Sequence, residues 1–300
     1  MIKRSILALA LASALALPLG SALAVSGAPV AENLELTTYR NVSVGGRLAA
    51  VDPEGDALSF EITTQPGKGT VELTEDGRFV YTPETNRKGR DYFGYRAVDE
   101  TGARSQEATV IIKIEKQKTS TTYADLDGHP AGYAATALAE NGIFTAESVA
   151  GVSVFSPGRE VTRGEFLSMC MALSGGEMLS GVASTGFADD ADIGDWLKPV
   201  VATALMDGVV SGYTVSGGAV FEPDDTVTRQ EAAVMLDNVL DTTDAAVGVS
   251  GAADWAAEAV GNLAACGVIA EGEAYSEPLT RAGAAEMLVR ALDVLAAREG

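Results

Sequence analysis

Three arginines occupy the same repeated position in the second half of the chain, each directly after a threonine: Arg163, Arg229 and Arg281. Residues 119–300 contain only 7 Lys and Arg against 27 Asp and Glu, so a cation at this place calls for an explanation. Each arginine is predicted at the first position of a helix, where the helix dipole disfavours a cation. A guanidinium beside free backbone N–H groups can bind an anion. The alternative is an ion pair between each arginine and an acid of the neighbouring repeat.

The residues around the arginines predict where helices begin and end. Threonine followed three residues later by glutamate is a capping box, and glycine after an Ala-rich stretch favours a left-handed helix end. The expected capping residues are Thr162, Glu165, Thr228, Glu231, Gly142, Gly208 and Gly267. The three glycines lie 66 and 59 residues apart and the arginines 66 and 52, which predicts three helix–loop–helix units with loops of unequal length.

These units resemble S-layer homology (SLH) modules over about residues 121–296. The middle copy carries the resemblance through Phe187-Ala188-Asp189, Trp196, residues 204–213, Phe221-Glu222-Pro223 and Val227-Thr228-Arg229-Gln230-Glu231. The resemblance implies an all-α pseudo-threefold bundle with grooves between repeats. It also implies non-covalent binding of secondary cell-wall polysaccharide, often through a pyruvylated and therefore anionic sugar.

The family's groove residues match unevenly. The middle copy matches at Asp189, Trp196, Gly212 and Arg229, so we expect one good groove that involves this copy. The first copy keeps Asp125 and Arg163 but has Pro130 where the family has tryptophan. The third copy is degenerate: it keeps Trp255 and Arg281, has a shorter loop, and carries Gly283 in place of the capping glutamate. For Trp196 the alternative is a tryptophan of the hydrophobic core.

Residues 25–118 alternate between apolar and polar with frequent turn residues, which predicts an all-β sandwich. Val71-Glu72-Leu73 and Phe79-Val80-Tyr81 flank a turn and predict a hairpin, and residues 108–114 predict a closing strand. The segment resembles a cadherin-like, immunoglobulin-like (Ig-like) module of bacterial surface proteins. The resemblance rests on residues 28–31, 51–56, 69–71, 81–83 and 91–95.

Acidic residues of this module are candidate calcium ligands, because calcium prefers carboxylate and carbonyl oxygens. The candidates are Asp52, Glu54, Asp56 and Asp99. The alternative is that Asp-Pro-Glu-Gly-Asp forms a turn in which aspartate accepts local backbone hydrogen bonds. No other cofactor is predicted, because one His and two Cys do not make a zinc site of the common kinds.

Composition limits the function classes. A formal net charge of −21 over 300 residues argues against nucleic-acid binding, because such binding needs a basic surface that neutralises the phosphates of the nucleic acid. Lys3 and Arg4, an apolar run and Ala22-Leu23-Ala24 predict a signal peptide over residues 1–24. No later segment predicts a transmembrane helix. The predicted domains are therefore 25–118, 119–184, 185–245 and 246–300, with the polar segment 116–122 as the linker.

The sequence thus predicts a secreted protein of the cell surface or cell wall (S-layer) whose SLH repeats bind secondary cell-wall polysaccharide and which displays an Ig-like module. It does not predict an enzyme, because no Ser or Cys near His129 has the pattern of an activated nucleophile. Cys170 and Cys266 are expected to be buried free thiols. Two alternatives stay open. One is an adhesin whose Ig-like domain binds a protein or glycan, with calcium, and the other is an envelope enzyme. The polymer and the partner of the Ig-like domain are not identified.

Overall fold

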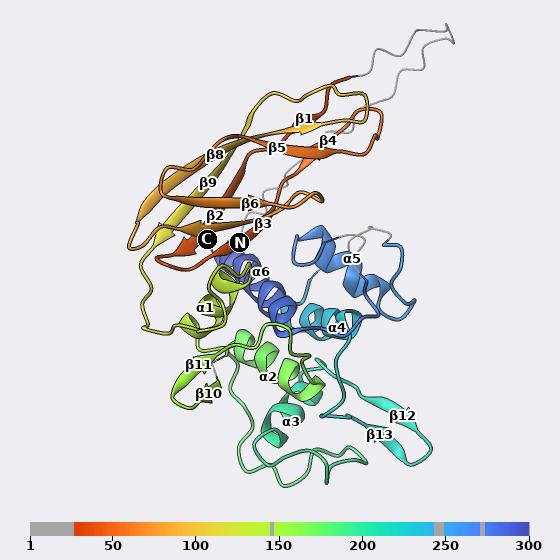
Figure 1. Ribbon diagram of the computed structural model, residues 1–300. Helices are drawn as coiled ribbons and strands as arrows, with labels where there is room; N and C mark the ends of the chain where they lie inside the picture. The colour runs from red at the N-terminus through yellow and green to blue at the C-terminus, as the bar shows by residue number, and fades with distance from the viewer. Residues whose placement is uncertain (1–26, 145–146, 243–248, 271–273, 300) are drawn as a thin grey trace, which may run out of the picture.

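The computed structural model describes residues 27–144, 147–242, 249–270 and 274–299. A part made of strands comes first in the chain and a part made of helices follows it (Figure 1). The predicted signal peptide, residues 1–24, and the predicted boundary at 245/246 lie outside the described residues.

The β-part has a four-stranded sheet, a three-stranded sheet and a short pair of strands within the described residues. The four-stranded sheet has the order β2 (Leu34–Tyr39), β9 (Ala108–Glu115), β8 (Gly89–Val98) and β5 (Ser59–Thr64). The three-stranded sheet has the order β3 (Val44–Arg47), β7 (Arg78–Pro83) and β6 (Gly69–Leu73), while β1 (Val30–Ala31) pairs with β4 (Ala50–Val51).

The two larger sheets form a sandwich with a shared hydrophobic core, and buried residues alternate with more exposed ones along their strands. Phe79 and Tyr81 of β7 are buried in the same cluster as Phe93 of β8 and Ile112 of β9. The predicted hairpin is present, with Leu73 of β6 opposite Phe79. The parallel pairing of β2 with β9 was not predicted, because it joins strands that are far apart in the sequence. The expected all-β class of this part is confirmed.

The helical part repeats a short element order. Its helices are α1 (Gly132–Glu140), α2 (Arg163–Ser174), α3 (Lys198–Met206), α4 (Arg229–Leu240), α5 (Ala257–Ala265) and α6 (Arg281–Glu299). Between α1 and α2 lies the hairpin of β10 (Glu147–Val149) and β11 (Val152–Val154). Between α3 and α4 lies the hairpin of β12 (Tyr213–Val215) and β13 (Gly218–Val220). Only loops were predicted at these two places.

Local hydrogen bonds define the helix ends. Thr162 and Thr228 are the N-caps of α2 and α4, and both capping boxes are complete with Glu165 and Glu231. After α1, α3 and α5 the chain turns through glycines with φ of +69°, +75° and +75°: Gly142, Gly208 and Gly267. The next residue in each case donates its amide to a carbonyl of the last helical turn, as in a Schellman motif.

A ring of backbone hydrogen bonds joins the segments that precede α2, α4 and α6. Val161 donates its amide to Leu279 O (2.9 Å), Leu279 donates to Val227 O (2.9 Å), and Val227 donates to Val161 O (3.0 Å). Each segment therefore pairs with both of the others. The six helices named above all contribute buried side chains to the hydrophobic core around this ring.

The two parts of the chain pack directly against each other. Gly45 of β3 donates its amide to Pro130 O (2.8 Å), and Tyr133 of α1 donates to Ser43 O (2.9 Å). The rings of Tyr39 and Tyr133 lie 5.4 Å apart between centroids, and burial raises the pKa of Tyr133 to about 12. The segment predicted as a linker is thus accompanied by a direct contact between β-sandwich and helices.

Candidate functional site

The backbone N–H groups at the starts of the arginine-bearing helices are engaged by neighbouring repeats. The first two amides of α2, α4 and α6 each donate to backbone carbonyls of a loop: Arg163 to Asp225, Gly164 to Pro223, Arg229 to Glu277, Gln230 to Tyr275, Arg281 to Arg159 and Ala282 to Pro157. The expectation that free helix N-terminal amides would bind an anion is therefore wrong. The reason is that these amides hold the repeats together.

Arg163 reaches from α2 into the middle repeat and is buried there. Its Nε donates to Phe221 O (3.0 Å) and its Nη1 donates to Tyr213 Oη (2.7 Å) and Glu231 Oε1 (3.2 Å). The guanidinium also lies 4.5 Å from the centre of the Tyr213 ring. This is the ion pair with a neighbouring acid that stood as the alternative, with a cation–π contact added.

Protonation states in this cluster follow from its contacts. Burial and the hydrogen bond to Glu231 raise the pKa of Tyr213. Burial also raises the pKa of Glu231, but hydrogen bonds from Tyr213 and Thr228 and the charge of Arg163 together hold the pKa below its usual value. Tyr213 is therefore a phenol donor to an ionised Glu231 at neutral pH.

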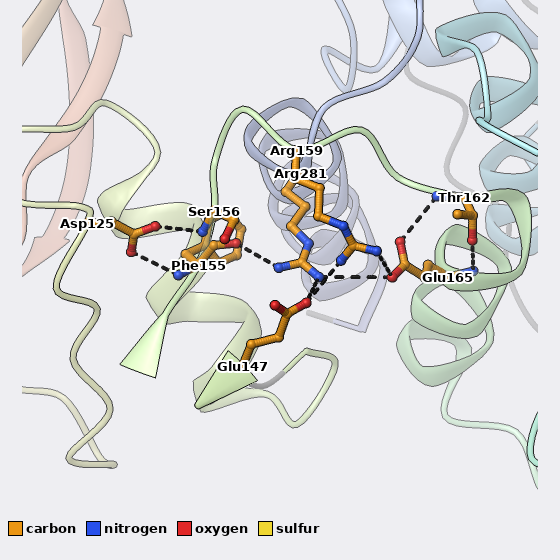
Figure 2. A network of polar contacts seen from close by, with 8 residues as sticks. All are labelled: Asp125, Glu147, Phe155, Ser156, Arg159, Thr162, Glu165 and Arg281. Atoms are coloured by element: carbon orange, nitrogen blue, oxygen red, sulfur yellow. Dashed lines mark hydrogen bonds and ion pairs between the residues drawn. The ribbon is translucent and has the colours of Figure 1, made fainter. Parts of the chain in front are cut away.

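Arg281 makes the corresponding contacts in the first repeat (Figure 2). Its Nη1 donates to Phe155 O (2.9 Å), its Nη2 pairs with Glu147, and Glu165 Oε1 lies 3.9 Å from the same nitrogen. Its guanidinium lies 5.1 Å from the centre of the Phe144 ring. Arg281 is thus surrounded by residues of the first repeat, although it begins the last helix of the chain.

Arg159 is a candidate functional residue that was not predicted from the sequence. It donates from Nη1 to Glu147 Oε1 (3.0 Å) and from Nη2 to Glu165 Oε1 (2.6 Å), so it shares both acids with Arg281. It precedes the capping box of α2 but falls at no repeated position, and spacing alone could not have identified it.

Asp125 and Asp189 fix the backbone segments whose carbonyls accept hydrogen bonds from Arg281 and Arg163. Asp125 accepts hydrogen bonds from the amides of Phe155 (2.8 Å) and Ser156 (2.6 Å). Asp189 accepts the amides of the equivalent residues 221 (2.9 Å) and 222 (2.7 Å) in the middle repeat. Ser156 and its counterpart at 222 have φ of +57° and +59°, a conformation that non-glycine residues rarely adopt without such support. The two aspartates therefore position the arginine sites.

The tryptophans face solvent. The exposed fraction is 65% for Trp196 and 58% for Trp255, so the alternative of a core tryptophan is wrong. Trp196 lines a groove of about 260 Å³ together with Phe144, Glu165 and Arg281. This groove brings together an aromatic ring from the middle repeat, an aromatic ring from the first, and a cation from the third.

Of the residues expected to form the groove of the middle repeat, Asp189 accepts backbone amides and Trp196 lines a groove beside Arg281. Gly212 has φ of +71°, and a Cβ there would lie 2.4 Å from the Phe187 ring, so its role is packing. Arg229 is half-buried, with Nη1 3.6 Å from where a Cβ of Gly283 would lie. Gly283 stands where the other two repeats have their capping glutamates.

Two family models match the chain in the parts just described. A bacterial cadherin-like domain matches residues 26–116, and an S-layer homology domain matches residues 186–233. The chain contains an SLH domain and, before it, a cadherin-like domain. The SLH match covers α3, the β12–β13 hairpin and the first turn of α4, which belong to the predicted middle repeat.

Curated relatives of this chain are much longer than it is. A 125 kDa surface-layer protein of Lysinibacillus sphaericus is 29% identical over 148 residues, which are 48% of this chain and 11% of the relative. An exoglucanase of Acetivibrio thermocellus is 36% identical over 90 residues, which are 28% of this chain and 8% of the relative. The SLH domain and the surface-layer relative point to a cell-surface protein.

Solved structures resemble only part of the chain. An endo-fucoidan hydrolase is 24% identical with a TM-score of 0.25, covering 32% of this chain and 14% of that one. An adhesin of Streptococcus sanguinis is 18% identical with a TM-score of 0.25, covering 33% of this chain and 62% of that one. Likenesses at these scores carry no argument about function.

The acidic residues of the cadherin-like domain form turns. Asp52 Oδ1 accepts the amides of Glu54 (2.9 Å) and Asp56 (3.1 Å), and Asp99 Oδ1 accepts those of Thr101 (2.8 Å) and Ala103 (2.9 Å). In the described residues no three His, Cys, Asp or Glu side chains are arranged to hold a metal ion. Asp52 Oδ2 and Asp99 Oδ2 are nevertheless buried without a hydrogen-bond partner. Burial, then the charges of neighbouring acids including Asp52 and Asp99, raises the pKa of Asp56.

The remaining candidate residues have ordinary structural roles. His129 Nδ1 accepts the amide of Ala131 (3.1 Å), and burial lowers its pKa. Cys170 is a buried free thiol as expected, and burial raises its pKa. Cys266 is also free but is exposed, so its expected burial is wrong: it lies at the end of α5, on the surface. Within the described part of the chain, no helix is both long and apolar enough to cross a membrane.

Proposed function

We propose that this protein anchors itself non-covalently to the cell wall by binding a secondary cell-wall polysaccharide, and that it presents the cadherin-like domain outward. Residues 119–184, 185–245 and 246–300 are then three SLH repeats, the last one degenerate, in a pseudo-threefold bundle. The ring formed by residues 161, 227 and 279 supports this arrangement, because each of the three segments donates one backbone hydrogen bond and accepts one. The SLH and cadherin-like matches describe a structural or binding protein rather than an enzyme.

The groove at Trp196 and Arg281 carries the proposal. The exposed indole and the ring of Phe144 offer apolar faces to the C–H face of a sugar. The guanidinium of Arg281 supplies a charge-assisted donor for an acidic substituent such as the carboxylate of a pyruvylated sugar. Such pairing acts at contact distance, whereas repulsion from the acidic surface is screened beyond roughly 8 Å at physiological salt.

The test is sedimentation of the full-length protein with purified cell-wall sacculi at physiological ionic strength. Trp196→Ala is the variant of choice, because its exposed ring contributes little to the core while it forms one wall of the groove. We expect it to weaken binding by about tenfold, the loss of one aromatic contact with the sugar. Tyr92→Ala removes an exposed aromatic ring of the β-sandwich and is the matched control, expected to bind as the wild type does.

Sacculi stripped of their secondary polymer provide the second arm. Loss of wild-type binding to stripped sacculi is the expected result. Equal binding to stripped and intact sacculi, or equal binding by Trp196→Ala and wild type, contradicts the proposal. Failure of the wild type to bind intact sacculi favours the adhesin alternative, in which the cadherin-like domain binds a protein or glycan.

We also propose calcium as a ligand of the cadherin-like domain at Asp52 and Asp99, with Glu54 and Asp56 beside them. The partnerless buried oxygens of Asp52 and Asp99 favour it, because a buried carboxylate oxygen without a partner is costly. Calcium at about 100 times its Kd should stabilise the domain by about 2.7 kcal/mol. The midpoint of thermal unfolding is measured in calcium, in magnesium and in chelator. Asp99→Asn should abolish the shift, and an unchanged midpoint of the wild type contradicts the site.

A further inference from the structure

Glu147 connects the two arginines beside the groove. Its Oε1 accepts from Arg159 Nη1 at 3.0 Å and pairs with Arg281 Nη2, so one carboxylate oxygen serves two guanidiniums (Figure 2). The Arg281 side chain is only 5% exposed, whereas that of Glu147 is 50% exposed. The acid therefore reaches a largely buried cation from the solvent side.

The middle repeat has a different residue at the same place. Glu147 is the first residue of β10 and pairs with Val154, which precedes Phe155. Tyr213 is the first residue of β12 and pairs with Val220, which precedes the phenylalanine at 221. Since Phe155 O accepts Arg281 and Phe221 O accepts Arg163, Glu147 and Tyr213 occupy equivalent positions next to equivalent arginines.

The two sites therefore differ in charge. Arg163 contacts a phenol and the partly buried capping acid Glu231, so its charge is neutralised within the protein. Arg281 has a second cation beside it, Arg159, and its closest acid is the exposed Glu147 rather than the capping acid Glu165, which lies at 3.9 Å. Removing Glu147 would leave two guanidiniums facing a single carboxylate.

We propose that Glu147 is an internal counter-ion that holds the place of the ligand's carboxylate, and that Arg159 is the second cation of the site. This inference rests on the proposed function and deepens it. The acid of the polymer exchanges with Glu147 on Arg281 and Arg159, while Glu165 stays in its capping box and Phe155 O keeps Arg281 in position. The Glu147–Arg159 pair is partly exposed and contributes little in water, and the incoming carboxylate leaves the buried Arg281 guanidinium with a counter-ion, so the exchange is inexpensive. A neutral sugar offers no replacement for Glu147, and the device selects for acidic ligands.

The experiment is a calorimetric titration of full-length protein with a methyl hexoside that carries a pyruvate ketal, using the uncharged methyl ester of the same compound as the matched probe. Glu147→Gln keeps the shape of the side chain and removes its charge, and should tighten binding of the acid about threefold to tenfold. Glu147→Tyr copies the residue of the middle repeat and should tighten it as well. Neither variant should bind the ester more tightly than the wild type does.

A further variant tests the second cation. Arg159→Ala combined with Glu147→Gln should lose the gain of the single variant, since one guanidinium is then missing. Thermal unfolding of each variant shows that the fold is retained. Unchanged or weaker binding of the acid by Glu147→Gln overturns the inference, as does equal tightening toward the ester or no binding by either protein. Wall anchoring is judged separately, by whether the wild type still sediments with sacculi.

Discussion

Replacing Gly212 by alanine is expected to lower the free energy of unfolding of the helical part by about 3–5 kcal/mol. The residue has φ of +71°, which costs an L-residue about 1–2 kcal/mol. A Cβ would also lie 2.4 Å from a ring carbon of Phe187 and 2.5 Å from Val220 O. The first contact involves a buried ring and the second a backbone atom of β13, so neither gives way easily.

Gly208→Ala is the matched control. Gly208 has φ of +75° but nothing within 4 Å of the position of a Cβ, so it carries the backbone cost without the clash. Its expected loss is about 1–2 kcal/mol. Urea unfolding followed by far-UV circular dichroism, which reports mainly on the helices, measures both. Equal losses for the two variants would show that the loop around 212 repacks and that the close approach to Phe187 is unimportant.

Arg163→Ala is expected to destabilise the helical part by about 3–5 kcal/mol, because it removes a buried guanidinium and leaves the partly buried Glu231 without its cation. The Phe221 carbonyl and the Tyr213 hydroxyl lose a donor at the same time. The variant removes a contact between the first and middle repeats rather than an exposed binding group. A loss of binding by Arg163→Ala therefore reports on the binding site only if the stability of the variant has been measured first.

Arg159→Ala provides the comparison, since its side chain is 40% exposed and pairs with acids that are also partly exposed. Exposed pairs of this kind contribute about 0–1 kcal/mol. The same urea titration, with both variants and the wild type in one buffer, gives the difference. A loss below about 1 kcal/mol for Arg163→Ala would contradict a structural role for that arginine.

Local features of the fold were predictable because their causes are local. A threonine hydroxyl that accepts the amide three residues on, and a glycine that adopts positive φ after a helix, involve only near neighbours. The hairpin of β6 and β7 follows from alternation around a tight turn in the same way. The pairing of β2 with β9 and the contact of Pro130 with β3 join distant residues, and no local pattern determines them.

The residues that share a groove could not be predicted for the same reason. Trp196 and Arg229 belong to one sequence motif, but the bundle places Trp196 beside an arginine 85 positions along the chain, Arg281. The arginines were found by spacing, whereas their acids came from other repeats. Asp125 and Asp189 matched the family's groove and yet serve backbone amides, a role that composition cannot distinguish from ligand binding.

The ring at residues 161, 227 and 279 has a consequence for how such a chain can diverge. Each segment donates one hydrogen bond to one neighbour and accepts one from the other. Deleting any copy therefore leaves one unsatisfied donor and one unsatisfied acceptor on the two that remain. The third copy has exchanged its capping glutamate for Gly283, but it still supplies Leu279 to the ring. A copy can therefore lose a motif residue such as its capping glutamate while its backbone stays indispensable. Sequence decay in one repeat is then no sign that the repeat has become dispensable.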